Sequence, residues 1–168
     1  MELGGQILAL ATGAGEAYAV VVACPRSSSG CNAPALLYRT ALGTDRWSEV
    51  PGAPVLPEAV AAPLNLVVEG RTVFLGTSYP RPKLYVSADG DRFSSLGVPC
   101  GQQSTRGPGP FRPAGLSASS PSDLVMVCYG EPGMGSLPTE LFISHDGGRP
   151  SAPCPSPPCS ARVPRQLW

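Results

Sequence analysis

The residues that could carry out enzymatic catalysis are few in this sequence and badly spaced for it. His145 is the only histidine, and it lies directly between Ser144 and Asp146. A catalytic triad brings its serine, histidine and aspartate together from separated positions, so three neighbours in one turn do not form that geometry. We therefore exclude triad catalysis and name no catalytic residue.

A glycine-rich stretch also fails as a cofactor site. Residues 130–135 read Gly-Glu-Pro-Gly-Met-Gly, which includes a proline and lacks the Gly-Lys-Ser/Thr ending of a phosphate-binding loop. No predicted helix follows it, so the backbone N–H groups that bind phosphate would be missing. The sequence predicts no cofactor.

The six cysteines favour disulfide bonds over a metal centre. No two of them form the CxxC pair on which many zinc sites are built, and a lone histidine adds little, so we predict no metal. Six cysteines allow fifteen connectivities. The sequence favours three pairings between neighbours: Cys24 with Cys31, Cys100 with Cys128, and Cys154 with Cys159. Disulfides need an oxidising compartment, which predicts an extracellular or cell-envelope protein, although the N-terminus does not resemble a signal peptide.

Composition narrows the classes of partner. Lysine and arginine together number 12, as do aspartate and glutamate, and the net charge of zero argues against nucleic acid and anionic membrane surfaces as partners. The longest apolar stretch, residues 17–24, is too short to span a bilayer. The length of 168 residues fits one domain, and 42% hydrophobic residues suffice for a core.

Short apolar segments separated by glycine and proline predict an all-β fold. The segments fall into three units, at about residues 6–52, 64–98 and 114–149, and each reads as four short antiparallel strands. No segment has a helical period over more than two turns. The intervening residues 51–63 and 99–113 are rich in proline, which predicts connections rather than central strands.

Two of the predicted turns share the pattern Ser-x-Asp-Gly. The aspartate can accept hydrogen bonds from backbone N–H groups that follow it, and the glycines can adopt positive φ. We interpret both turns as folding devices, with these structural residues: Ser87, Asp89, Gly90 and Phe93 in one, and Ser144, Asp146, Gly147 and Gly148 in the other.

These turns resemble the Asp-box, or BNR repeat, of sialidase-like β-propellers. Residues 144–149 are the closer match, whereas residues 87–93 carry Asp91 where the repeat prefers glycine, and residues 38–47 lack the Ser-x-Asp core. The resemblance implies a β-propeller segment of about three four-stranded blades. Because propellers close with about four to eight blades, the propeller would be incomplete. In that family the box joins the third and fourth strands, away from the central pocket.

Residues 150–168 fit no blade. They are rich in proline and are predicted to be a disordered tail. Two explanations stay open: a segment from a shifted reading frame, or a genuine proline-rich end closed by Cys154 and Cys159.

The sequence predicts the function of this protein only in general terms. We expect a non-catalytic binding or scaffold propeller of an exported bacterial protein, with a glycan or a protein as ligand. The alternative is a fragment of a sialidase-like glycoside hydrolase, of the exo-α-sialidase type, that lacks most of its active site. Such enzymes use an arginine cluster, a tyrosine activated by glutamate and an aspartate acid/base. Arg39 is the one arginine of interest in a predicted strand, but it does not stand in the Arg-Ile-Pro motif of those enzymes. A third class, an assembly factor for photosynthetic complexes, rests on repeat analogy alone.

Overall fold

The computed structural model confirms the all-β prediction. It describes residues 5–23, 33–56, 64–78, 82–101, 112–130 and 139–149. The first sheet contains β1 (Gln6–Gly13), β2 (Glu16–Val22), β3 (Ala35–Ala41) and β4 (Ser48–Glu49). The middle sheet contains β5 (Leu64–Glu69), β6 (Thr72–Thr77), β7 (Lys83–Ser87) and β8 (Ser94–Leu96), followed by a single 3-10 turn, η2 (Pro99–Gly101). The third sheet contains β9 (Arg112–Ala118), β10 (Leu124–Tyr129) and β11 (Thr139–Ser144).

Each sheet is an antiparallel meander in which every strand pairs with its neighbours in sequence. The first and middle sheets have four strands, as predicted. The third has three within the described residues, and a fourth would fall beyond residue 149, outside them. The two-residue connections between β1 and β2 and between β5 and β6 suit this arrangement, because antiparallel strands need only a tight turn between them. The three sheets do not close into a ring in the described part of the chain.

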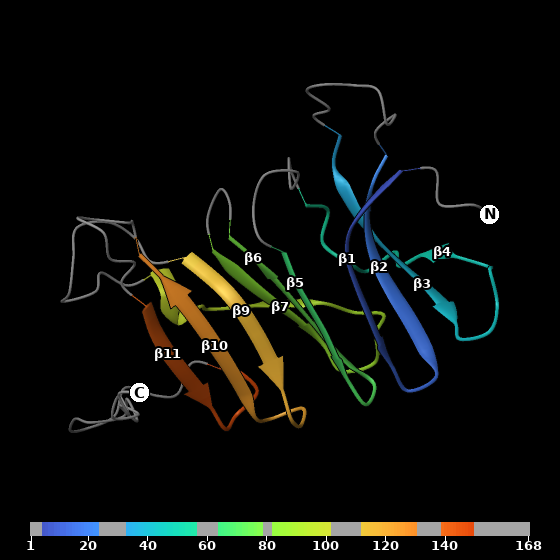
Figure 1. The fold of residues 1–168 in the computed structure, drawn as a ribbon. Coiled ribbons are helices and arrows are strands. Elements are labelled where there is room, and N and C mark those ends of the chain that lie inside the picture. Colours follow the sequence, from blue (N-terminus) through green and yellow to red (C-terminus); the bar gives the residue numbers. More distant parts are fainter. Residues whose placement is uncertain are drawn as a thin grey trace, which may run out of the picture.

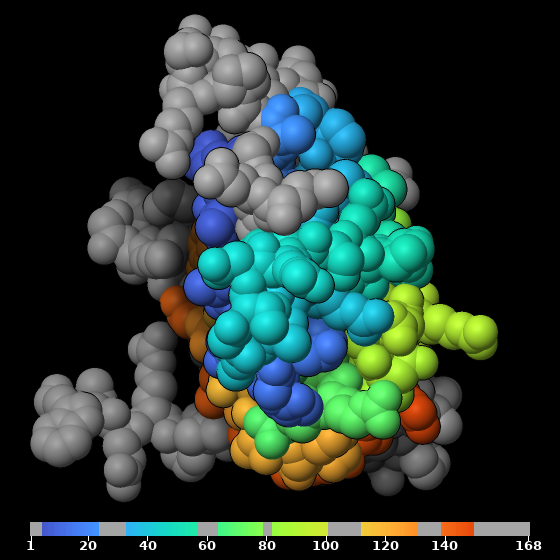
Figure 2. Space-filling model, turned by 90° about the vertical axis from the view of Figure 1, so that its right-hand side faces the viewer, coloured from blue at the N-terminus to red at the C-terminus, as the bar shows by residue number. Residues whose placement is uncertain are grey.

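The sheets are arranged like a fan around their first strands. β5 lies against β1 on one side and against β9 on the other. From this shared edge the first and third sheets spread to opposite sides of the molecule, with the middle sheet between them (Figure 1). The side view in Figure 2 shows the outer part of the first sheet, residues 33–56 in cyan, next to green and yellow-green segments of the middle sheet.

The middle sheet is buried on both faces. Successive side chains of a strand point to opposite faces. Val73 and Leu75 on β6 pack in one cluster with β2 and β3, whereas Phe74 packs in a second cluster with β10. All six residues of β6 are buried. This two-sided burial explains why residues 73–76 of β6 form a continuous apolar run rather than an alternating pattern.

Two proline-rich stretches differ from the prediction. The predicted connection over residues 99–113 ends early, because β9 already begins at Arg112 and includes Pro113. The proline is tolerated because β9 is an edge strand of its sheet and the ladder with β10 shifts register between Val127 and Cys128. Within residues 51–63, Leu56 forms an isolated antiparallel bridge with Ala35, closed by N–H···O distances of 2.9 and 3.1 Å.

Candidate functional site

The turn between β7 and β8 is organised by one carboxylate oxygen. Asp89 Oδ1 accepts hydrogen bonds from the Ser87 hydroxyl at 2.9 Å, the Asp91 N–H at 2.9 Å and the Arg92 N–H at 3.0 Å. These donors, the backbone N–H groups first, lower the pKa of Asp89 to about 2. Gly90 has a φ of 79°, a region that glycine adopts without a Cβ penalty. The carboxylate is therefore held in the turn by local hydrogen bonds.

The same turn is attached to the first sheet. A Cβ added at Gly90 would meet the Tyr18 hydroxyl, and one added at Gly52 would meet the Asp91 carbonyl oxygen. Asp91 Oδ1 also forms an ion pair with Arg39 Nη1 at 2.8 Å. Neither glycine can carry a side chain here without a shift of its neighbours, so the turn of the middle sheet is packed closely against the first sheet.

A tyrosine, a glutamate and an arginine meet at this junction. The Tyr18 hydroxyl donates to Glu16 Oε2 at 2.7 Å, and Arg39 lies near enough to influence the same phenol. Tyr18 is only 2% exposed. Burial first, and then the hydrogen bond to Glu16, raise the pKa of Tyr18 to about 12, although Arg39 acts in the opposite direction.

The second Ser-x-Asp-Gly turn, after β11, has a different hydrogen-bond centre. The Ser144 hydroxyl donates to Asp146 Oδ1 at 2.6 Å and accepts from the N–H groups of Gly148 at 2.8 Å and Asp146 at 3.3 Å. The hydroxyl oxygen thus takes the place that the Asp89 carboxylate has in the first turn. A Cβ at Gly148 would lie 3.2 Å from the Leu84 side chain. This turn therefore packs against the middle sheet, the one that precedes it.

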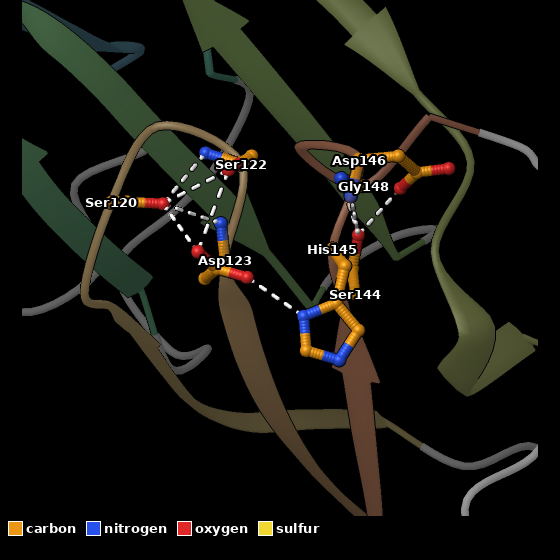
Figure 3. A network of polar contacts seen from close by, with 7 residues as sticks. All are labelled: Ser120, Ser122, Asp123, Ser144, His145, Asp146 and Gly148. Carbon is orange, nitrogen blue, oxygen red and sulfur yellow. Dashed lines mark hydrogen bonds and ion pairs between the residues drawn. The ribbon is translucent and has the colours of Figure 1, made fainter.

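A small polar network joins this turn to the β9–β10 turn (Figure 3). His145 Nδ1 lies 2.7 Å from Asp123 Oδ1, and the Ser120 hydroxyl donates to Asp123 Oδ2 at 2.7 Å. The hydrogen bond from His145, followed by that from Ser120, lowers the pKa of Asp123. The sequence did not indicate the His145–Asp123 pair, because the two residues lie 22 positions apart in different turns.

The network does not assemble a nucleophile. The His145 side chain is 80% exposed, and the neighbouring Ser144 hydroxyl points into its own turn, where it donates a hydrogen bond to Asp146. A serine nucleophile would instead donate its hydroxyl proton to the histidine. The arrangement links two adjacent turns of the third sheet.

The Tyr18–Glu16–Arg39 group contains the residue types of a sialidase-like nucleophile, with Glu16 as the hydrogen-bond acceptor of the phenol. A nucleophile is activated by a lowered pKa or by a base that removes its proton. With its pKa raised to about 12, the Tyr18 phenol is protonated at neutral pH unless Glu16 takes its proton. Arg39, moreover, already forms an ion pair with the Asp91 carboxylate.

The Cys100–Cys128 disulfide is confirmed and joins η2 to β10. It lies in the cluster between the middle and third sheets, where both cysteines are fully buried. The four other cysteines of the predicted pairs, Cys24, Cys31, Cys154 and Cys159, lie outside the described residues, as does the predicted tail. Among the residues that the structure describes, no cluster of histidine, cysteine and acidic side chains could hold a metal ion, and no helix has the length and hydropathy to cross a membrane.

Comparison of the chain with protein-family models, with curated proteins and with solved structures gave no match. The fold and the contacts described above are thus the basis for a functional proposal.

Proposed function

We propose that this chain is a β-propeller segment of an exported protein, in which it serves as a non-catalytic binding or scaffold module. The propeller assignment is supported by three meander sheets whose first strands lie side by side. It is also supported by two glycine turns, each packed on the sheet that precedes it. The buried Cys100–Cys128 bridge supports an extracellular or cell-envelope location, since such bridges persist in oxidising compartments.

One observation carries the non-catalytic assignment: the groups with catalytic potential are engaged with each other. Tyr18 is bonded to Glu16, Arg39 to Asp91, and Asp89 to three donors of its own turn. The Arg39–Asp91 pair joins two sheets and the Asp89 contacts close a turn, whereas the Tyr18–Glu16 hydrogen bond lies within β2. A binding module needs no chemically activated side chain, so a structural use of these polar groups is consistent with that function.

A protein is the better candidate for the ligand than a glycan. The large hydrophobic side chains exposed in the described ranges are all aliphatic: Ile7, Leu10, Leu42, Val55, Leu141 and Ile143. Exposed apolar side chains that gather into patches mark protein–protein contacts. Sugar rings, by contrast, pack well on flat aromatic side chains, and none is among these exposed residues.

The alternative, a sialidase-like glycosidase fragment, is favoured by the Tyr18–Glu16–Arg39 group alone. A fluorogenic sialoside assay and an NMR titration with 3′-sialyllactose separate the two functions. The scaffold module predicts no turnover above a blank and no saturable shift of the Arg39 side-chain resonance, because Asp91 keeps that guanidinium paired. Turnover that Tyr18→Phe abolishes, or saturable binding that Arg39→Gln abolishes, would instead establish the sialidase-like function.

A further inference from the structure

The contact between the middle and third sheets includes polar groups near the end of β6. Phe74 packs towards the third sheet, and Gly76 faces the same side because it lies two positions further along the strand. Ser78, which follows β6, is buried, and its hydroxyl donates to the Pro113 carbonyl oxygen of β9 at 2.8 Å. Both β5 and β6 contact β9 (Figure 1), so any polar group on this face lies between two sheets.

Asn65 brings a further polar group to this face. It lies on β5 directly opposite Gly76 in the ladder, so its side chain points to the same side of the sheet. Within the part of the chain that the structure describes, Asn65 Nδ2 is the one buried side-chain nitrogen or oxygen atom without a hydrogen-bond partner. Buried polar groups are nearly always hydrogen-bonded, because a buried donor without an acceptor costs free energy. An acceptor for the Asn65 amide is therefore expected close by.

Gly76 leaves room for a small acceptor beside this amide. A Cβ added at Gly76 would lie 3.4 Å from Asn65 Cβ, 3.8 Å from the Asn65 backbone carbonyl oxygen and 3.9 Å from Asn65 Nδ2. All three are ordinary van der Waals distances. An oxygen atom about 1 Å nearer to Asn65 would come within hydrogen-bond distance, about 2.9 Å, of both the amide nitrogen and the carbonyl oxygen.

We propose that Asn65 and Gly76 form a binding site for one structural water molecule between the middle and third sheets. The water accepts a hydrogen bond from Asn65 Nδ2 and donates one to the Asn65 carbonyl oxygen. A buried water needs about two to four polar partners, and these two atoms meet that condition. Because water both donates and accepts, it fits the amide in either orientation. Gly76 is buried, so the ligand must be small as well as polar. The site is independent of the proposed binding or scaffold function.

Gly76→Ala displaces the water and leaves the Asn65 side chain in place. Where the backbone suits alanine, Gly→Ala favours the folded state by about two- to fivefold, because it restricts the unfolded chain. At Gly76, however, the Asn65 donor also loses its acceptor, which shifts the unfolding equilibrium by about fivefold or more in the opposite direction. We therefore expect Gly76→Ala to lower the midpoint of urea unfolding.

Two further variants make this measurement decisive. Gly115→Ala on β9 is the matched control, because neither Gly115 nor Gly76 has a positive φ and a Cβ at Gly115 would lie 4.0 Å from Val127 Cβ. It should not lower the urea midpoint. In an Asn65→Val background no donor needs an acceptor, so Gly76→Ala should raise the midpoint there. The effect of Gly76→Ala on the unfolding constant should thus differ at least about fivefold between the two backgrounds. An equal effect in both backgrounds overturns the proposal.

Water-selective NMR on the full wild-type chain detects the bound molecule itself. A water that stays bound for longer than the protein takes to tumble gives laboratory-frame and rotating-frame Overhauser effects of opposite sign, whereas proton exchange gives effects of the same sign. We expect opposite signs at the Asn65 side-chain amide protons and their loss in Gly76→Ala. The amide of Gln6, which is exposed on β1, is the control and should show the same sign in both. Effects of the same sign at Asn65 in the wild type overturn the proposal.

Discussion

Replacing Gly90 by alanine should destabilise the protein more than the same change at Gly43. Both glycines lie in a turn between a third and a fourth strand, with φ of 79° and 85°. Alanine in this left-handed region costs about 1–2 kcal/mol at either position. At Gly43 the new Cβ meets no atom, whereas at Gly90 it meets the Tyr18 hydroxyl.

The extra cost at Gly90 follows from that contact. The Tyr18 hydroxyl must move, which strains or breaks its 2.7 Å hydrogen bond to Glu16. A hydrogen bond of this kind contributes about 1 kcal/mol, and overpacking in a filled site costs about 1–3 kcal/mol. We therefore expect Gly90→Ala to lower the free energy of unfolding by about 3–6 kcal/mol and Gly43→Ala by about 1–2 kcal/mol.

Urea unfolding followed by far-ultraviolet circular dichroism measures both losses. Combining Gly90→Ala with Tyr18→Phe completes a double-mutant cycle, because phenylalanine lacks the hydroxyl that the new Cβ would meet. The double variant should lose about 2–4 kcal/mol less than the sum of the single losses, because phenylalanine relieves the overpacking and the lost hydrogen bond is then counted only once. Equal losses at Gly90 and Gly43, together with an additive cycle, would refute the claim that the turn is locked onto Tyr18.

Three further predictions concern stability in acid, tyrosine ionisation in base and removal of the disulfide bond. The pKa of Asp89 lies near 2 in the folded protein, below its ordinary value of 3.8, so its contribution to stability is present above pH 4 and is lost as the pH falls towards 2. In urea unfolding from pH 5 to 2, Asp89→Asn should therefore lose less stability with falling pH than the wild type does. The raised pKa of Tyr18 stabilises the fold below pH 10, and that contribution is lost between pH 10 and about 12. Absorbance at 295 nm should show one tyrosine that ionises late, near pH 12. If this late titration persists in Tyr18→Phe, its assignment to Tyr18 is wrong. Replacing Cys100 and Cys128 together by alanine opens a loop of 28 residues and should cost about 3–4 kcal/mol in the same unfolding assay; a loss below about 1 kcal/mol would show that the bridge contributes little.

The sequence predicted the features of this fold that depend on local pattern. Apolar runs punctuated by glycine and proline located the antiparallel strands, because a tight turn and its flanking strands are specified by neighbouring residues. The Ser-x-Asp-Gly pattern placed Asp89 and Gly90 in a turn between strands. The Cys100–Cys128 bridge was also among the predicted pairings, and the structure confirms it.

Contacts between distant segments were not predictable in this way. The partner of Gly90 is Tyr18, 72 positions away, and the partner of His145 is Asp123 in another turn. Both pairs exist only because whole sheets or turns come together, which no local pattern encodes. The prediction at Pro113 was wrong because a local rule was applied too strictly. A proline usually interrupts a strand, but here it is tolerated in an edge strand beside a shift in register.

The fan arrangement of the three sheets is the basis of the proposed function, and one NMR measurement tests it directly. Gly13 at the end of β1 lies so close to β5 that an added Cβ would touch the Val68 side chain. We predict a clear nuclear Overhauser effect between the Gly13 α-protons and a Val68 methyl group. Val68 pairs with Val73 within the middle sheet, which provides an internal positive control. If the Val68–Val73 effect is present and the Gly13–Val68 effect is absent, the first strands do not lie side by side and the propeller assignment is wrong.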